Sequence, residues 1–219
     1  MRAARELQRM RAMTVGGIVV CGGKSNRMGR PKEWLPFEGE PMLARVVRML
    51  ATVVSPVVVV AAAGQELPPL PDGVFVLRDP RPDQGPLEGI AAGLNAIETE
   101  FAYLSACDVP LIRPEFVQAV IDRVMNCDAA IPNIGGRLYP LSSVVRVAPA
   151  RTAARHLLDA DRRAARFLFE ELEAAQLGES ELRAVDPELH SFRNANTPED
   201  YEELLRLISS ESESGPVGP

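Results

Sequence analysis

One stretch of the sequence combines glycine, lysine and arginine in a way that suits phosphate binding. Residues 21–32 read Cys-Gly-Gly-Lys-Ser-Asn-Arg-Met-Gly-Arg-Pro-Lys. Glycine has no Cβ, so backbone N–H groups can approach phosphate oxygens, and cationic side chains neutralise the phosphate charge. Lys24 and Lys32 are the only lysines in the sequence, and both lie in this stretch. We therefore predict a phosphate-binding loop at residues 21–32; a glycine-rich turn between a strand and a helix is the alternative.

Asp108 has the chemistry of a metal-binding carboxylate. It follows the apolar run 101–106, which has the length and composition of a buried strand. Mg²⁺ binds to one or two carboxylates together with substrate phosphates. Ligands of open parallel sheets bind beyond the carboxyl ends of the strands, so we expect Asp108 and residues 21–32 at one edge. The sequence predicts a metal–nucleotide site there, and an N-capping aspartate before Pro114 is the alternative.

A third polar cluster, residues 194–200, precedes the last helical segment. Thr197 as N-cap and Asp200 three residues later form a near capping box, which is a sufficient structural explanation for both. A helix N-terminus also attracts anions, and Asn194 and Asn196 in front of it carry amide groups that can bind a polar heterocycle. We keep both interpretations of this cluster, a structural helix cap and a ligand-binding site.

Apolar runs of strand length alternate with segments of helical periodicity. The strand-like runs are 15–20, 57–61, 74–77 and 101–106, and the helical segments between and after them are 41–54, 87–97 and 114–125. This alternation predicts an α/β fold, a three-layer α/β/α sandwich around a mostly parallel, twisted, Rossmann-like sheet.

The pattern changes after residue 129. Strands are expected around a turn at residues 135–136, then helices near 150–160 and 162–175, and a last helix after Pro198. The middle of the chain contains no Pro/Gly/Ser-rich linker. We therefore predict a single domain over residues 14–209 with flexible ends at 1–13 and 210–219.

Composition and charge exclude several classes of function. The chain has 219 residues, of which 46% are hydrophobic and 25% charged, a balance typical of globular proteins. No apolar run approaches the roughly 20 residues that cross a bilayer. The net charge of −6 argues against sequence-independent binding to a nucleic-acid backbone. We expect neither a membrane nor a nucleic acid as a partner.

The cysteines indicate a reducing compartment. Cys21, Cys107 and Cys127 are odd in number and show no metal-ligand spacing, which is typical of buried free thiols. Cys107 stands beside Asp108, but neither histidine of the chain has a recognisable partner as a catalytic base, so a nucleophilic cysteine is not expected. These observations predict a cytoplasmic protein.

The spacing of the glycine-rich stretch excludes two common nucleotide motifs. A Walker A loop reads G-x-x-x-x-G-K-[ST]; residues 23–25 supply its end, but Ile18 occupies the position of its first glycine. The dinucleotide pattern G-x-G-x-x-G is also absent from the sequence. The phosphate loop is therefore of another type.

Four motifs in order resemble the molybdenum cofactor guanylyltransferases, a family of MobA-like nucleotidyltransferases. Residues 20–32 resemble its signature L-A-G-G-x-S-x-R-M-G-x-D-K, and Asp79 with residues 85–90 resembles D…G-P-L-A-G-[IM]. Residues 101–110 are similar to its apolar strand ending in C-D-x-P, and residues 194–200 to N-x-N-T-P-E-[DE]. The resemblance implies the fold of nucleotide-diphospho-sugar transferases.

The family transfers GMP from GTP to the phosphate of molybdopterin and releases pyrophosphate, with Mg²⁺ as cofactor. The resemblance implies that the nucleotide is bound by Val20, Cys21, Gly22, Gly23, Lys32, Asp79 and Asp108. It implies catalytic roles for Lys32, Arg27 and Asp108, with Asp108 also as the metal ligand. The residues it implies for the pterin are Gly85, Gly89, Asn194 and Asn196. Expected partners are GTP, molybdopterin and proteins of cofactor assembly.

Two departures from the family pattern leave alternatives open. Pro31 stands where the family has aspartate, and residues 60–63 lack an expected asparagine. The form R-M-G-x-P-K also occurs among related cytidylyltransferases, so a cytidylyl- or sugar-phosphate nucleotidyltransferase on the same scaffold is one alternative. A catalytically silent nucleotide-binding partner is another. Gly22 in place of alanine leaves room for a purine and favours guanine.

Overall fold

The computed structural model of the chain describes residues 14–21, 28–79 and 84–213. Of the ends predicted to be flexible at 1–13 and 210–219, residues 1–13 and 214–219 lie outside the described residues, as do residues 22–27 and 80–83. The last helix, α8, continues to Glu213, beyond the predicted domain boundary at residue 209.

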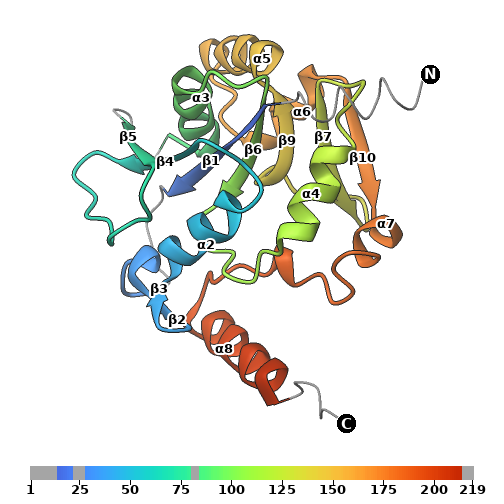
Figure 1. Cartoon of the computed structure of the whole chain (residues 1–219). Helices are drawn as coiled ribbons and strands as arrows, with labels where there is room; N and C mark the ends of the chain where they lie inside the picture. The colour runs from blue at the N-terminus through green and yellow to red at the C-terminus, as the bar shows by residue number, and fades with distance from the viewer. Residues whose placement is uncertain (1–13, 22–27, 80–83, 214–219) are drawn as a thin grey trace.

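An eight-stranded sheet forms the centre of the described structure (Figure 1), with strand order β10-β7-β9-β6-β1-β4-β5 and β8 paired with β7. Its strands are β1 (Val15–Cys21), β4 (Val57–Ala62), β5 (Val74–Asp79), β6 (Phe101–Ala106), β7 (Ala129–Ile134), β8 (Arg137–Leu138), β9 (Ser142–Arg146) and β10 (Ala174–Gly178). The pairs β1–β4, β1–β6, β4–β5 and β7–β10 are parallel, whereas β9 pairs antiparallel with both β6 and β7. The prediction of a mostly parallel sheet is confirmed.

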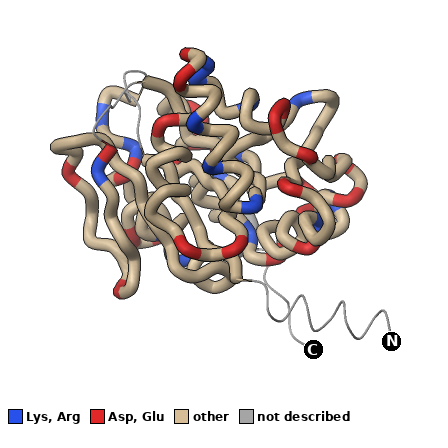
Figure 2. Tube along the Cα trace, turned by 90° about the horizontal axis from the view of Figure 1, so that it is seen from above, with Lys and Arg blue, Asp and Glu red and all other residues tan. Residues whose placement is uncertain are grey.

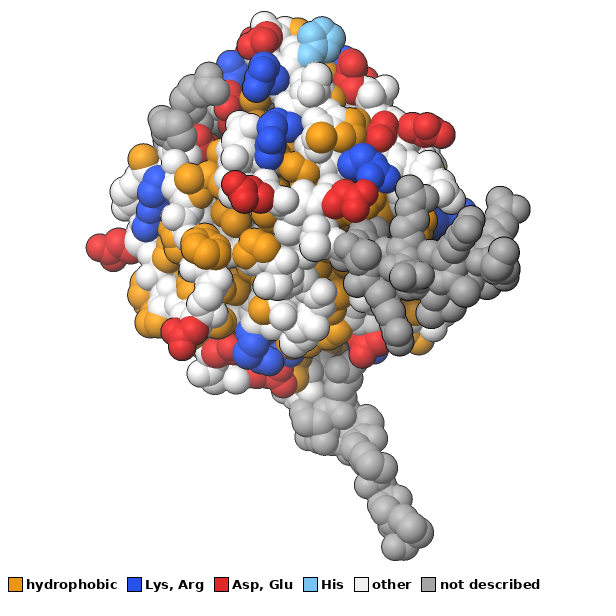
Figure 3. Space-filling model, turned by 45° about the horizontal axis from the view of Figure 1, so that its top comes forward, with side chains coloured by type: hydrophobic (Ala, Val, Ile, Leu, Met, Phe, Trp, Pro, Cys, Tyr) orange, Lys and Arg blue, Asp and Glu red, His pale blue; other side chains and the backbone are white. Residues whose placement is uncertain are grey.

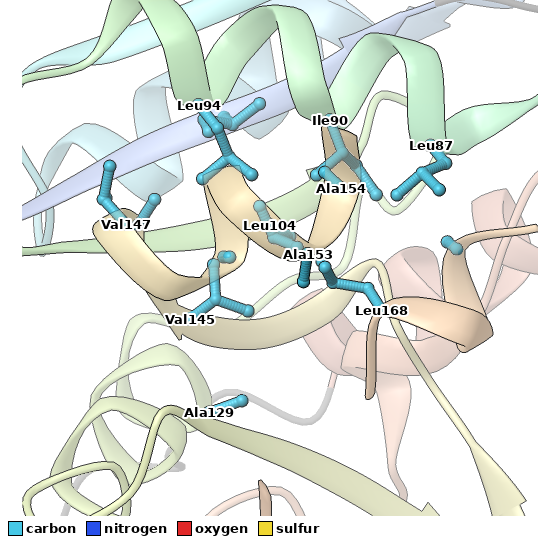
Figure 4. Packing of buried hydrophobic residues seen from close by; sticks show 14 of the residues in the cluster. Leu87, Ile90, Leu94, Leu104, Ala129, Val145, Val147, Ala153, Ala154 and Leu168 are labelled. Atoms are coloured by element: carbon cyan, nitrogen blue, oxygen red, sulfur yellow. The ribbon is translucent and has the colours of Figure 1, made fainter. Parts of the chain in front are cut away.

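The central strands are apolar because helices cover both faces of the sheet. On one face α3 (Pro86–Ala96) and α5 (Val147–Asp159) pack, and on the other α2 (Met42–Ala51) and α4 (Pro114–Asp122) (Figure 1). Figure 4 shows the first of these cores, where Leu87, Ile90 and Leu94 of α3 meet Ala154 of α5. The predicted three-layer sandwich is confirmed.

Helix α3 packs unusually close to the sheet. A Cβ built on Gly93 would lie 2.4 Å from Ile18 Cγ2 of β1, and one on Gly89 would lie 3.0 Å from Val20 Cγ1. Glycine at these two positions lets the helix approach β1. The carboxyl end of β1 therefore lies directly under the first turns of α3.

A third, smaller core joins two segments that are far apart in the sequence. The short hairpin of β2 (Pro36–Phe37) and β3 (Glu40–Pro41) lies near α8 (Pro198–Glu213), which is the red helix at the bottom of Figure 1. Buried side chains of both segments pack together: Met28, Leu35, Phe37 and Met42 with Tyr201 and Leu204. The chain after the glycine-rich stretch is thereby fixed to the C-terminal part of the described chain.

The structure corrects the prediction of a helix over 162–175. Only η2 (Ala165–Phe167) and α6 (Leu168–Glu171) are helical there, and β10 then pairs in parallel with β7. Leu172 adopts an extended backbone with φ −109°, which ends the helix. Pairing with the sheet edge outweighs the helical periodicity of these residues. The sequence analysis also did not identify α7 (Glu179–Arg183), η1 (Lys32–Trp34) or η3 (His190–Phe192).

Charged residues of both signs are distributed along the described part of the chain (Figure 2). On the face in Figure 3, acidic and basic side chains stand side by side among hydrophobic ones. Across the part of the chain that the structure describes, no helix is both long and apolar enough to span a bilayer.

Tyr103 of β6 is completely buried, and burial raises the pKa of its hydroxyl. Its oxygen has no hydrogen-bond partner among the described residues. Tyr103→Phe is therefore expected to raise the free energy of unfolding by about 1 kcal/mol. This corresponds to a rise in Tm of roughly 2–4 °C, measurable by calorimetry.

Tyr201→Phe is the matched control, because the Tyr201 hydroxyl donates a hydrogen bond to the carbonyl of Pro36. Its loss should lower the free energy of unfolding by about 1 kcal/mol. A lower Tm for Tyr103→Phe would show that its hydroxyl has a partner after all.

Candidate active site

The carboxyl ends of four parallel strands meet at one edge of the sheet. β1 ends at Cys21, β4 at Ala62, β5 at Asp79 and β6 just before Asp108. This is the edge at which open α/β sheets bind ligands. The topology therefore brings Cys21, the first residue of the glycine-rich stretch, and Asp108 to the same side of the molecule, as predicted.

Four predicted site residues form one hydrogen-bonded cluster at this edge. Lys32 Nζ donates to Asp108 Oδ2 and to Asn196 Oδ1, each at 2.9 Å. Asn194 Nδ2 donates to Asp108 Oδ1 at 2.7 Å. Residues separated by 164 positions in the sequence are thus in direct contact. We call Lys32, Asp108, Asn194 and Asn196 the Lys–Asp–Asn cluster.

The cluster is shielded from solvent but remains accessible. The side chains of Lys32 and Asp108 are 17% and 12% exposed. Ammonium–carboxylate hydrogen bonds of this length are charge-assisted and stronger than neutral ones. The amide of Asn196 gives the ammonium a second acceptor, so the Lys32 side chain is held in a defined position beside Asp108.

Local hydrogen bonds fix the C-terminal half of the cluster. Ala195 N donates to the backbone oxygen of Asp108 at 2.9 Å, which places the two asparagines on either side of that contact. Thr197 N donates to Asp200 Oδ2, and Asp200 N to Thr197 Oγ1, at 2.9 and 3.1 Å. The predicted capping box at the start of α8 is confirmed.

The other half of the cluster is carried by the short helix η1. Leu35 N donates to the carbonyl of Lys32, which closes the turn, and Leu35 and Phe37 are buried in the third core. The burial of Leu35 and Phe37 therefore fixes the backbone near Lys32, while the long side chain of Lys32 reaches Asp108.

Cys107 lies next to Asp108 but is not suited to be a nucleophile. A hydrogen bond with Cys21 and burial raise the pKa of the Cys107 thiol well above its ordinary value. A thiol that resists ionisation is a poor nucleophile. All three cysteines are free, as predicted, but only Cys21 is buried; Cys107 and Cys127 are half-buried, which corrects the prediction of three buried thiols.

Several predicted site residues are placed elsewhere or not described. Gly22, Gly23, Lys24 and Arg27 lie outside the described residues. The side chain of Val20 is buried against Gly89 of α3, so any ligand contact of Val20 must come from its backbone.

Asp79 lines a cavity of about 400 Å³ between β5, α3 and α5. Its other polar lining residues include Glu88, Asn95 and Arg155, and its described lining does not include Lys32 or Asp108. The structure therefore places Asp79 at the same sheet edge as the Lys–Asp–Asn cluster but in a different hollow.

Gly85 lies directly before α3 with φ 97°, a conformation that favours glycine. A Cβ here would lie 2.9 Å from the carbonyl oxygen of Arg163. Arg163 Nη1 also pairs with the buried Glu88 at 2.8 Å. The loop after α5 is thereby attached to the first turn of α3, and this explains the glycine without a ligand.

The sequence profile of the MobA-like NTP transferase domain matches residues 17–177. The chain belongs to this family. The MobA-like match covers most of β1 and the whole of β4, β5 and β6, and therefore includes the sheet edge that carries Lys32 and Asp108. It ends before Asn194 and Asn196, which the structure adds to the site.

Curated MobA-like relatives align with nearly the whole chain. A probable molybdenum cofactor guanylyltransferase of Methanosarcina acetivorans is 31% identical over 219 residues, covering 95% of this chain and 97% of its own. A molybdenum cofactor guanylyltransferase of Desulfosudis oleivorans is 31% identical over 198 residues, covering 90% and 96%. The resemblance read from the four motifs is confirmed.

Solved structures of MobA-like and related proteins confirm the fold. Molybdopterin-guanine dinucleotide biosynthesis protein A of Archaeoglobus fulgidus superposes with a TM-score of 0.73 at 22% identity, covering 89% of this chain and 99% of its own. A 2-C-methyl-D-erythritol 4-phosphate cytidylyltransferase of Thermus thermophilus superposes with a TM-score of 0.69 at 18% identity, covering 90% and 100%. Both share the nucleotide-diphospho-sugar transferase fold with this MobA-like chain.

Two buried polar residues near the cluster escaped the sequence analysis. Glu33 follows Lys32 directly and is only 5% exposed, and Gln65 donates to its carboxylate from the loop after β4. The sequence contains one signal for Glu33: it is a charged residue that follows the motif lysine and precedes the apolar residues 34–37. Gln65 could not be identified as the partner of Glu33 from local spacing, because the two residues lie 32 positions apart.

Proposed function

We propose that the protein transfers GMP from GTP to the phosphate of molybdopterin, releasing pyrophosphate and forming molybdopterin guanine dinucleotide. The observation that carries this proposal is the Lys–Asp–Asn cluster, in which an ammonium and a carboxylate stand at the ligand-binding edge of a nucleotidyltransferase sheet. The names of relatives that align with nearly the whole chain support the choice of GTP and molybdopterin.

The reaction needs positioning and charge neutralisation more than covalent help from the protein. An oxygen of the molybdopterin phosphate attacks the α-phosphorus of GTP in line, a new P–O bond forms, and the bond to pyrophosphate breaks. Lys32 lies where a compact positive charge can neutralise phosphate oxygens, a role that suits lysine better than the planar arginine fork. Arg27 is proposed to help from the glycine-rich loop.

The donor set at Asp108 fits Mg²⁺. A carboxylate beside the expected triphosphate matches the preference of Mg²⁺ for one or two carboxylates completed by substrate phosphates. Among the described residues no group of three His, Cys, Asp or Glu side chains forms a metal cage, so substrate oxygens would complete the coordination. Bound there, the ion would supply positive charge to the phosphates. Asp108 would hold it, and Asn194, which donates to Asp108 Oδ1, would orient the carboxylate.

The remaining substrate contacts are proposed from the family resemblance. The nucleotide would contact Gly22, Gly23 and Asp79, and the backbone of Val20 and Cys21. The pterin would lie toward Gly85, Gly89 and the two asparagines, whose side chains also bind the cluster. We place the reaction in the cytoplasm, where free cysteines remain reduced and proteins of cofactor assembly can supply molybdopterin.

Product analysis tests this function directly. The protein is incubated with Mg²⁺, molybdopterin and either GTP, CTP or UTP. The products are then separated and identified by mass spectrometry. We expect molybdopterin guanine dinucleotide and pyrophosphate with GTP only. A cytosine dinucleotide would assign the protein to the cytidylyltransferases on this scaffold, and GTP binding without pyrophosphate release would make it a silent nucleotide-binding partner.

A further inference from the structure

Glu33 is a buried charge directly beside the lysine of the active site. It is 5% exposed, although glutamate is seldom buried without a partner. Its Oε1 accepts a hydrogen bond of 2.6 Å from Gln65 Nε2. Removing a carboxylate from water is costly, so a buried glutamate at this position needs an explanation.

Gln65 connects three segments at the carboxyl edge of the sheet. Its Oε1 accepts from Ala62 N at 2.9 Å, at the end of β4. Its Nε2 reaches Glu33 and also Cys21 Sγ at 3.7 Å, at the end of β1. One carboxamide thus links the end of β4, the end of β1 and the helix η1.

Gln65 itself is held firmly. Its backbone N donates to the carbonyl of Ala62 at 3.1 Å, and its carbonyl accepts from Arg78 Nη1 at 2.6 Å. The neighbouring residues are joined as well, because Trp34 Nε1 donates to the carbonyl of Glu66 at 3.1 Å. The segment 32–34 is therefore hydrogen-bonded to the turn at residues 65–66.

This attachment is independent of the Lys–Asp–Asn cluster. In the described structure Lys32 Nζ is held by Asp108 and Asn196. If Asp108 turns to a cation during the proposed reaction, the ammonium loses one of these partners. The bond between Glu33 and Gln65 remains, so the backbone of Lys32 stays in place while its side chain turns to phosphate oxygens.

We propose that Glu33 and Gln65 are positioning residues that hold Lys32 in the geometry required for nucleotidyl transfer. This inference rests on the proposed function of Lys32, and it assigns to the pair no contact with either substrate. A displacement of about 1 Å at a catalytic group can reduce a rate by roughly 10²-fold. A buried hydrogen bond one residue from Lys32 is placed to prevent such a displacement.

The test uses the full-length protein and six variants. Glu33→Ala and Gln65→Ala break the bond, whereas Glu33→Gln keeps an oxygen that can accept from Gln65. Lys32→Ala and the double variant K32A/E33A measure the coupling between Lys32 and Glu33. Glu66→Gln is the matched control, because Glu66 is exposed and uses only its backbone carbonyl in this network.

In steady-state transfer assays, Glu33→Ala and Gln65→Ala are expected to lower kcat about 10-fold or more without changing the KM for the pterin substrate. Glu33→Gln and Glu66→Gln should remain within about 3-fold of the unmodified protein. The double variant should be no slower than Lys32→Ala, because a residue that acts through Lys32 has no effect without it. A further loss in the double variant, or a rise in KM alone, would overturn the proposal.

A second measurement does not depend on activity. The chain has only two lysines, so reductive methylation with ¹³C-formaldehyde labels Lys24, Lys32 and the N-terminal amine, and Lys32→Ala assigns the Lys32 signal. We expect Glu33→Ala and Gln65→Ala to shift or broaden that signal and Glu66→Gln to leave it unchanged. If no nucleotide is transferred but the signal responds in this way, the proposed function fails and the positioning role stands. Normal transfer with no change in kcat or signal rejects the positioning role alone.

Discussion

Asp108→Ala is expected to lower kcat/KM for nucleotidyl transfer by about 10²–10³-fold. Asp108 is the carboxylate of the Lys–Asp–Asn cluster, and its two oxygens accept from Lys32 and Asn194. The substitution removes the only described carboxylate in this cluster and leaves the Lys32 ammonium with Asn196 as its remaining described acceptor. Pyrophosphate release and dinucleotide formation, measured with saturating Mg²⁺ and GTP, should fall together.

Asp128→Asn is the control for this experiment. Asp128 lies just before β7, which runs in the same direction as β6, so it stands at the opposite edge of the sheet from Asp108. Its carboxylate is 37% exposed and forms a long ion pair with Arg146 at 4.0 Å. The control should keep full activity. Near-normal turnover of a folded Asp108→Ala protein would show that this carboxylate is not part of the reacting site.

Lys32→Ala is expected to reduce kcat about 10²-fold. The ammonium group is held by Asp108 and Asn196 at the ligand-binding edge, and its charge is needed most when the bond to pyrophosphate breaks. Lys32→Arg should restore little of this loss, because a planar guanidinium cannot occupy the place of a compact ammonium. Single-turnover assays would separate the chemical step from product release.

Arg48→Ala is the control for Lys32→Ala, because it also removes one positive charge. Arg48 lies on α2 and pairs with Glu40 at 2.6 Å, and its side chain is 49% exposed. An exposed pair of this kind contributes less than about 1 kcal/mol to stability. Full activity of Arg48→Ala beside an inactive Lys32→Ala would locate the effect at the cluster. Equal activity of both variants would exclude Lys32 from catalysis.

Much of the sheet was predictable from local patterns. The runs at 15–20, 57–61 and 101–106 correspond to β1, β4 and β6, since strands buried on both faces are continuously apolar. The hairpin-like region around residues 135–136 is also confirmed, with β7 and β8 on either side of the turn. Crossover rules then placed Asp108 and the end of β1 at one edge without any further information.

The error at 162–175 shows the limit of periodicity. These residues have apolar side chains at helical spacing, yet β10 completes the sheet beside β7. Whether a short segment becomes a helix or an edge strand depends on which sheet edge is free, and that is a property of the assembled fold.

The active site shows the same division between local and long-range information. The types of Lys32 and Asp108 indicated phosphate and metal chemistry before the fold was known. Their contacts with Asn194 and Asn196 depend on how the chain returns to the sheet edge after β10. The bond between Glu33 and Gln65 depends on a turn 32 positions away. Such pairs have no periodicity that a sequence could display.

The third core gives the active site a particular order of assembly. It joins residues that follow the glycine-rich stretch to Tyr201 and Leu204 of α8. During translation the parallel strands and Asp108 leave the ribosome well before these residues do. A nascent chain can thus form most of its sheet while Lys32 and Asp108 still lack Asn194 and Asn196, and nucleotide transfer should begin only after the last helix has been synthesised and has docked.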